Sequence, residues 1–271
     1  MNETTVDTSH CRIAVTTSPG QGPVLLMIHG NSSCKEVFRN QLNGAIGREF
    51  HCVAMDLPGH GRSADAIDPE RTYTMPGYAD AALQVMQALG HSKYAVLGWS
   101  LGGHIGIDMI AASDAVTGLM ISGTPPIAKG PDGLAAGFVP SPHMGLAGQR
   151  DFSPTDVENY ARSTCGVNAP FEPFLRDAVA RTDGRARENM IKGALAGKGC
   201  DQKATAQHSR VPLAIVNGAE DEFINNEYIA SLAYDRLWED KVYDLEGIGH
   251  APFWEAPALF DPYLRRFMHS L

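Results

Sequence analysis

Long apolar runs are missing from this sequence. The longest uninterrupted aliphatic stretch near its start, Val24 to Ile28, is far shorter than the roughly 20 residues of a membrane-spanning helix. The first residues, Met1 to Asp7, have neither the basic flank nor the apolar centre of a secretory signal. We therefore expect a cytoplasmic protein that does not act at a membrane.

Cysteines and basic residues are also scarce. The five cysteines are an odd number, and no two of them have the spacing of a metal or redox motif, which favours free thiols over disulfides or a metal site. With 22 basic against 31 acidic residues, the formal charge of -9 disfavours nucleic acids and anionic membranes as partners. Neutral or weakly polar small molecules remain as ligands, and no feature indicates an obligatory protein partner.

The chain does contain short apolar runs of strand length, and helical patterns such as Tyr78 to Leu89 lie between several of them. The runs are Val24 to Ile28, Cys52 to Met55, Tyr94 to Leu97, Gly118 to Ile121 and Leu213 to Val216. This alternation predicts an α/β fold with a mostly parallel central sheet flanked by helices. Each run ends in turn-forming or functional residues, and ligands bind at the carboxyl ends of such strands. We expect these ends to converge on one cleft.

The character of the sequence changes between about Pro125 and Arg210. Strand-like runs disappear there, and short amphipathic segments such as Thr155 to Ser163 and Phe171 to Thr182 replace them. Aromatic and methionine side chains supply apolar anchors, which disfavours a long disordered loop. The chain of 271 residues is thus predicted to form a core from residues 1–124 and 211–271, with residues 125–210 inserted as a helical cap.

The segment from Tyr94 to His104 joins an apolar run, a Gly-x-Ser-x-Gly turn and a helix-compatible stretch. A serine nucleophile in such an elbow has a cramped backbone, so side chains two residues to either side collide unless they are glycine. Gly98 and Gly102 occupy both places. The pentapeptide alone is weak in a chain with 28 glycines, but the flanking patterns supply the strand and helix that an elbow requires. We predict Ser100 as the nucleophile.

A serine hydroxyl is a poor nucleophile at neutral pH, so it needs a general base. His250 lies on a glycine-flanked loop after the strand-like Lys241 to Leu245. We predict it as the base; a solvent-exposed loop histidine without a catalytic role is the alternative.

An acid is needed to orient the base, and it is expected after one of two strands. The residues after Ile121 cannot ionise, which leaves the carboxylates after Val216. We predict Asp221, which has the usual spacing from the preceding glycine, with Glu220 as its rival. This acid would hold His250 in the tautomer that accepts the serine proton.

Acyl transfer also needs two preorganised donors for the oxyanion. One predicted donor is the backbone N–H of Leu101, directly after the nucleophile, and the other is the N–H of Asn31, in the loop after the first central strand. His29 in that loop is interpreted as a buried structural histidine. Asp56 to Ser63 is interpreted as a rigid turn whose Asp and Arg hold neighbouring loops.

Several motifs together resemble the α/β-hydrolase superfamily over nearly the whole chain. They are His29-Gly30, Asp56 to Ser63, Gly98 to Gly103, Gly218 to Asp221 and Gly249 to Pro252. A narrower set resembles the metal-independent, serine-type N-acyl-homoserine lactonases of this superfamily, which open the lactone ring of bacterial quorum-sensing signals. This set is His29 to Ser33, Gly98 to Gly106, Gly123 to Pro126, Leu146 to Gln149 and Tyr160 to Gly166.

The resemblance implies an α/β-hydrolase fold with an inserted cap, the same nucleophile, base, acid and oxyanion residues as above, and a substrate contact at Asn31. It also points to Tyr160 in the cap as a hydrogen-bond donor to the bound signal. The implied reaction opens an acyl-homoserine lactone through an acyl-enzyme and needs no cofactor or metal. Two other interpretations stay open: a general carboxylesterase with the same triad, and a hydrolase-like receptor that binds a small lactone.

Overall fold

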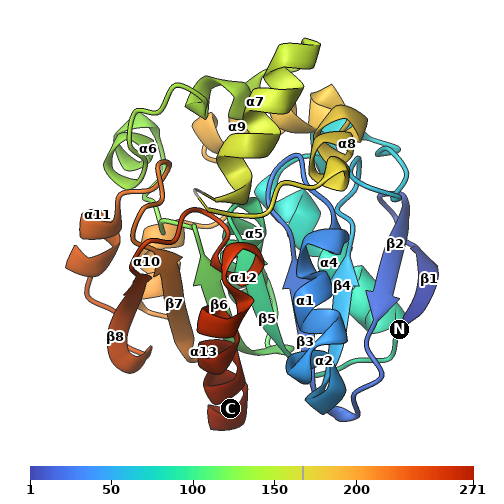
Figure 1. Ribbon diagram of the computed structural model, residues 1–271, viewed down its shortest axis with the longest axis vertical. Helices are drawn as coiled ribbons and strands as arrows, with labels where there is room; N and C mark the ends of the chain where they lie inside the picture. Colours follow the sequence, from blue (N-terminus) through green and yellow to red (C-terminus); the bar gives the residue numbers. More distant parts are fainter. Residues whose placement is uncertain (167) are drawn as a thin grey trace.

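A computed structural model describes residues 1–166 and 168–271 and shows one eight-stranded sheet with helices on both faces (Figure 1). The strands are β1 (Asn2–Asp7), β2 (Arg12–Thr17), β3 (Gly22–Ile28), β4 (Phe50–Met55), β5 (Tyr94–Trp99), β6 (Val116–Ser122), β7 (Leu213–Gly218) and β8 (Leu237–Leu245). Their order in the sheet is β1-β2-β4-β3-β5-β6-β7-β8. Strand β2 pairs antiparallel with β1 and β4, and all other pairs are parallel. The predicted mostly parallel sheet is confirmed, and β1 and β2 extend it beyond the predicted strands.

Helices pack on both faces of this sheet. They are α1 (Arg39–Asn43), α2 (Ala45–Glu49), α3 (Pro69–Thr72), α4 (Met75–Ala88), α5 (Leu101–Ala112), α6 (Pro131–Gly137), α7 (Pro154–Cys165), α8 (Pro173–Arg181), α9 (Gly184–Leu195), α10 (Gln202–Gln207), α11 (Asn226–Ser231), α12 (Pro252–Glu255) and α13 (Pro257–Ser270), with 3-10 turns η1 (Lys35–Phe38) and η2 (Met144–Gly148). In Figure 1, α1, α2 and α13 lie in front of the sheet, and α4 and α5 lie behind it.

The core has two apolar clusters, because successive side chains of a strand point to opposite faces. Leu26 and Ile28 of β3 belong to the cluster that includes residues of α4 and α5. Leu25 and Met27 belong to the cluster that includes residues of α1 and α13. All four side chains are fully buried, which explains why β3 is a nearly continuous apolar run rather than an alternating one.

Between β6 and β7, the described residues form α6 to α10 and none of the strands of the sheet. In Figure 1, α6, α7, α8 and α9 lie together at the top of the view. The end of α6 is tied to the core, because Val139 N donates to Phe223 O over 3.0 Å and Asn225 N donates to Gly137 O over 2.9 Å. The assignment of residues 125–210 to a separate cap remains a proposal, and residue 167 of that range lies outside the described residues.

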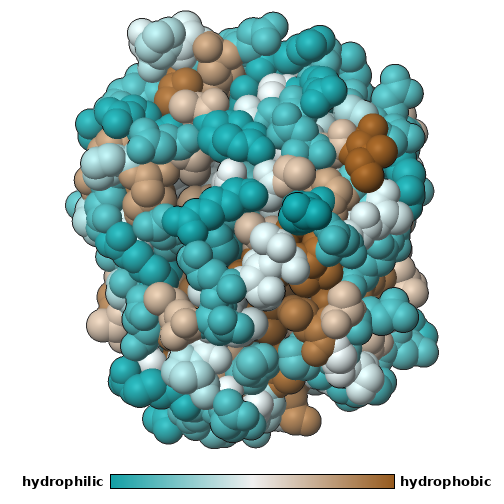
Figure 2. Space-filling model, turned by 90° about the vertical axis from the view of Figure 1, so that its right-hand side faces the viewer, coloured by the Kyte–Doolittle hydropathy of each residue, from teal (hydrophilic) through white to brown (hydrophobic). Residues whose placement is uncertain are grey.

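Figure 2 shows one face of the molecule, on which hydrophilic side chains predominate and an apolar strip runs from the centre toward the bottom of the view. Among the residues that the structure describes, the exposed large apolar side chains are Met1, Ile67, Leu195, Leu259 and Leu271. Within the described ranges, no helix is both long and apolar enough to span a bilayer.

Candidate active site

Ser100 lies in a strained turn between β5 and α5. Its φ of 53° and ψ of -118° form a conformation that residues other than glycine rarely adopt. A Cβ added to Gly98 would lie 2.4 Å from the carbonyl oxygen of Gly102, and one added to Gly102 would lie 2.0 Å from that of Ile28. The two glycines therefore permit the close contact between strand, turn and helix. The helix begins at Leu101, as the sequence predicts.

His250 and Asp221 form a buried pair. The Nδ1 of His250 lies 2.6 Å from Oδ2 of Asp221, and their side chains are 5% and 0% exposed. The other carboxylate oxygen accepts the backbone N–H of Phe223 over 2.9 Å. Because an ionised carboxylate can only accept, Nδ1 carries the proton and Nε2 of the neutral ring is left as an acceptor. This is the tautomer that a general base for a serine hydroxyl requires.

The rival acid is placed differently. The backbone N–H of Glu220 donates to Ile248 O, while Glu220 and Glu222 line a surface pocket of about 450 Å³ next to His250. Of these three neighbouring carboxylates, Asp221 is the one hydrogen-bonded to the imidazole in the described structure.

The imidazole of His250 is held from several sides. Its centroid lies 4.9 Å from that of Phe223 and 5.6 Å from that of Trp99, whose indole N–H donates to His250 O over 2.8 Å. Gly123, which has a φ of 62°, packs directly against the ring, because a Cβ at this position would lie 2.8 Å from Cε1 of His250. The sequence patterns did not single out Gly123 for this role. The one signal for it was its position directly after β6, where residues of the site are expected.

Ser100 and His250 line the same cavity. Among the hydrogen bonds of the described residues there is none between the Ser100 hydroxyl and the imidazole. In proteins without substrate such catalytic bonds are often long or misaligned and tighten only in the complex.

The two predicted oxyanion donors lie beside the nucleophile. Asn31 and Leu101 both line the cavity, and neither backbone N–H has a protein acceptor in the described part of the chain. The loop with Asn31 approaches closely, since a Cβ on Gly30 would lie 3.2 Å from Cβ of Ser100. Both N–H groups are therefore available to a ligand.

His29 braces this loop from the interior, as the sequence predicts. It is fully buried, its Nδ1–H donates to Gly30 O over 2.7 Å, and its Nε2 accepts the N–H of Leu57 over 3.0 Å. Burial lowers the pKa of His29 to about 4, so the ring is neutral and can hold both bonds.

Asp56 also holds neighbouring loops, as expected. Its carboxylate accepts the backbone N–H of Lys35 over 2.7 Å, the Lys35 ammonium over 3.0 Å and the backbone N–H of Arg62 over 2.9 Å. The expectation for the arginine is correct only for its backbone, because the Arg62 guanidinium pairs with Glu3 at the surface.

The loop after β3 meets the segment between β6 and β7 at Asn31. Its side-chain nitrogen donates to Ala147 O over 2.9 Å and to the Tyr160 hydroxyl over 3.2 Å. Burial raises the pKa of Tyr160 to about 12, so this hydroxyl keeps its proton. Arg187, which the sequence patterns did not single out, adds a second link by donating to Ser32 Oγ over 3.2 Å and to Gln149 O over 2.8 Å.

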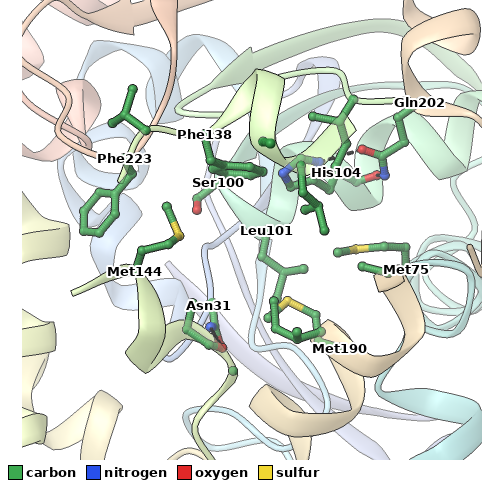
Figure 3. Close-up of a pocket in the computed structure, with 18 of the residues that line it drawn as sticks. Asn31, Met75, Ser100, Leu101, His104, Phe138, Met144, Met190, Gln202 and Phe223 are labelled. Atoms are coloured by element: carbon green, nitrogen blue, oxygen red, sulfur yellow. Dashed lines mark hydrogen bonds between the residues drawn. The ribbon is translucent and has the colours of Figure 1, made fainter. Parts of the chain in front are cut away.

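Ser100 opens onto a cavity of about 510 Å³, a size typical of small-molecule sites. Figure 3 shows that apolar side chains, among them Met75, Met144 and Met190, surround it, with Asn31 and Ser100 on its wall. The described residues contain no group of three or more side chains suited to hold a metal ion.

Comparisons with known proteins identify the family to which this fold belongs. A family model described as the alpha/beta hydrolase fold matches residues 23–257. The crystal structure of the N-acyl homoserine lactonase AidH with N-butanoyl homoserine is 51% identical, has a TM-score of 0.96, and matches 99% of this chain and 96% of that chain.

Two further relatives are esterases. The pimeloyl-[acyl-carrier protein] methyl ester esterase of Xanthomonas axonopodis pv. citri is 28% identical over 259 residues, covering 93% of this chain and 97% of that protein. The esterase RhEst1 from Rhodococcus sp. ECU1013, at 23% identity and a TM-score of 0.78 over 100% of this chain and 98% of that one, shares the fold. The chain belongs to the α/β-hydrolase family and is a hydrolase.

Proposed function

We propose that this hydrolase opens the lactone ring of N-acyl-homoserine lactones. The observation that carries the proposal is its 51% identity to AidH, with a TM-score of 0.96, over 99% of the chain. Structures of AidH hold N-butanoyl homoserine and, in a variant, N-hexanoyl homoserine lactone. The apolar cavity at Ser100 suits an acyl chain attached to a small polar head.

In the proposed mechanism, Nε2 of His250 takes the proton of the Ser100 hydroxyl as Ser100 Oγ attacks the lactone carbonyl carbon. The N–H groups of Leu101 and Asn31 stabilise the resulting oxyanion, and the imidazolium is stabilised by the Asp221 carboxylate, 2.6 Å from Nδ1. The ring C–O bond then breaks, and the departing alkoxide takes the proton from His250. Water, activated by the same imidazole, hydrolyses the acyl-enzyme and releases N-acyl homoserine.

The polar head of the substrate would lie near the link between cap and core. Asn31 and Tyr160 both line the cavity and are hydrogen-bonded to each other. The Tyr160 hydroxyl keeps a proton that it can donate to a carbonyl of the bound signal. The acyl chain would then lie along the methionine side chains of the cavity wall.

Mass spectrometry of the product tests this function. Ring opening adds one water and keeps acyl chain and homoserine joined, whereas amide cleavage separates them. We expect ring opening with multiple turnovers, no loss after treatment with a chelator, and a loss of more than about a thousandfold in Ser100→Ala. Amide cleavage, or full activity in Ser100→Ala, would contradict the proposal.

A general carboxylesterase is the second candidate, because curated relatives that cover nearly the whole chain are methyl ester esterases. The ratio of kcat/KM on a short acyl-homoserine lactone to that on a nitrophenyl ester decides between the two. A receptor would instead stall near a single turnover, whereas an enzyme runs at on the order of 1 to 1000 turnovers per second.

A further inference from the structure

One polar ring lies on the apolar cavity wall one helical turn beyond the nucleophile. His104, on α5, is 7% exposed and lines the cavity together with Ser100. Its Nδ1 lies 2.6 Å from Oε1 of Gln202, the first residue of α10. The mechanism proposed above makes no use of this ring.

The hydrogen bonds of Gln202 fix the tautomer of His104. The amide nitrogen of Gln202 lies 3.2 Å from the backbone carbonyl of His104 and 3.1 Å from Oδ2 of Asp108. A backbone carbonyl cannot donate, so the amide nitrogen must face it and the amide oxygen must face the imidazole. Nδ1 of His104 therefore carries the proton.

The other ring nitrogen is an unused acceptor. Burial lowers the pKa of His104 to about 4, so the ring is neutral and Nε2 bears a lone pair. Nε2 has no hydrogen-bond partner in the described part of the chain. It is also not one of the fully buried polar atoms without a partner, so it is accessible from the cavity. Figure 3 draws this nitrogen on the side of Ser100 and Phe138, away from Gln202. The Phe138 ring, with its centroid at 5.9 Å, makes the surroundings apolar.

The offset between the backbones of Ser100 and His104 indicates which substrate atom can reach this acceptor. His104 is the fourth residue of α5 and Ser100 is its N-cap, so the two backbones are offset by about 6 Å along the helix axis, and both side chains line the cavity. In an acyl-homoserine lactone, the third carbon of the acyl chain is five bonds from the lactone carbonyl carbon, roughly 6 Å for extended bonds of about 1.5 Å. The amide N–H is only two bonds from that carbon and lies too close to Ser100.

Resting on the lactonase function proposed above, we propose that His104 is a specificity-determining residue whose Nε2 accepts a hydrogen bond from a hydroxyl on the third acyl carbon. The preferred substrates are then 3-hydroxyacyl-homoserine lactones. A 3-oxo group has no proton to donate, so it would leave two acceptors facing each other in an apolar wall. A site built around a substrate hydroxyl discriminates strongly against an analogue that cannot make the bond.

The test compares kcat/KM on three lactones of equal chain length that are unsubstituted, 3-hydroxy or 3-oxo at the third acyl carbon. We expect the protein to prefer the 3-hydroxy over the 3-oxo lactone by about tenfold or more. In His104→Leu this ratio should fall to about one. In Gln202→Leu the His104 ring is free to change tautomer, so kcat/KM on the 3-oxo lactone should rise relative to kcat/KM on the 3-hydroxy lactone.

Met190→Leu is the matched control, because Met190 lines the same cavity with a side chain that makes no hydrogen bond. It should change all three rates together and leave their ratios unaltered. Equal rates on the 3-hydroxy and 3-oxo lactones, or an equal loss on all three in His104→Leu, would overturn the inference.

Binding of the same lactones to Ser100→Ala, measured by calorimetry, separates the inference from the proposed function. A 3-hydroxy preference in binding supports the role of His104 even if the wild type turns over no lactone. Turnover of all three lactones without any preference, in rate or in binding, rejects the role of His104 and leaves the lactonase function standing.

Discussion

The side-chain nitrogen of Asn31 donates to the Tyr160 hydroxyl over 3.2 Å and so joins the loop after β3 to α7. The same nitrogen donates to Ala147 O over 2.9 Å. One amide of the core is thus bonded to two segments between β6 and β7. Because the backbone N–H of Asn31 is also a proposed oxyanion donor, the position of that donor depends on contacts from the segment between β6 and β7.

Tyr160→Phe removes the hydroxyl and keeps the ring, which packs edge-on against Phe152 with centroids 5.7 Å apart. We expect kcat/KM on acyl-homoserine lactones to fall by about 3- to 10-fold, the effect of one neutral hydrogen bond. Steady-state kinetics on a lactone and on nitrophenyl acetate check this, and the acetate should be affected less. Phe152→Leu is the control for ring packing, and an unchanged lactone rate in Tyr160→Phe would contradict the proposed contact.

The strain at Ser100 predicts that two inactive variants differ in stability. Ser100→Gly and Ser100→Ala should both lose more than about a thousandfold in kcat. Only the glycine variant relieves the φ of 53°, so its free energy of unfolding should exceed that of Ser100→Ala by about 1 kcal/mol. Denaturant unfolding of both variants measures the difference. Equal stabilities would show that the turn stores no strain.

Exchanging each candidate acid for its amide separates Asp221 from Glu220. Asp221→Asn should lower kcat by about 10⁴-fold, because an amide no longer fixes the tautomer of His250. Glu220→Gln should stay within about threefold, since this side chain makes no hydrogen bond to the imidazole. If the glutamine variant were instead the inactive one, the acid would be misassigned.

Gly123→Ala should displace the imidazole of His250. The new Cβ would lie 2.8 Å from Cε1, and a shift of about 1 Å at a catalytic group can reduce kcat by about 100-fold. Gly130→Ala is a matched control, because Gly130 also has a positive φ, of 95°, but a Cβ there meets nothing within 4 Å. Comparable loss of kcat in both variants, at similar thermal stability, would contradict the steric explanation.

Asp261 should make the stability of the protein depend on pH. Burial raises the pKa of Asp261 to about 6, so the folded state favours the protonated carboxyl. Its contribution to stability is complete below the unfolded value of about 4 and is lost as the pH rises through 6. The side-chain nitrogen of Gln41 donates to Asp261 Oδ1 over 2.7 Å, and the buried Oε1 of Gln41 has no hydrogen-bond partner among the described residues.

We therefore expect Asp261→Asn to be about 1 kcal/mol more stable than the wild type at pH 7.5 and equally stable at pH 4. Denaturant unfolding across this pH range measures the gap. A gap of the same size at both ends would mean that the carboxyl does not titrate as described.

Local sequence patterns predicted the helices and strands that carry a clear apolar pattern or turn motif of their own. Helix α5 spans Leu101–Ala112 as expected, because the glycine turn and the apolar run before it leave no other boundary. Strands β1 and β2 were not predicted. Strand β1 (NETTVD) is almost entirely exposed and is held by backbone pairing with β2 rather than by an apolar pattern. Strand β2 (RIAVTT) is mostly buried, but its apolar run is only the three residues Ile13 to Val15.

The site shows the same division between local and distant information. The order and spacing of Ser100, Asp221 and His250 follow from motifs that the chain carries within a few residues of each. The bond from Arg187 to Ser32 joins residues 155 positions apart, and that from Gln202 to His104 joins residues 98 apart. Only the folded chain brings such partners together, so no local pattern could have indicated them.

The backbone bonds between residues 137–139 and 223–225 have a mechanical consequence. The second segment begins two residues after Asp221, so any swing of α6 away from the sheet would pull on the loop that carries this carboxylate. The junctions at Asn31 and Arg187, by contrast, consist of side-chain bonds that can break without moving a strand. We therefore expect a bulky ligand to displace η2 and α7 at the Asn31 junction before the end of α6 moves. The start of α9 is held more firmly, by a backbone bond from Asp183 N to Gly59 O over 2.9 Å.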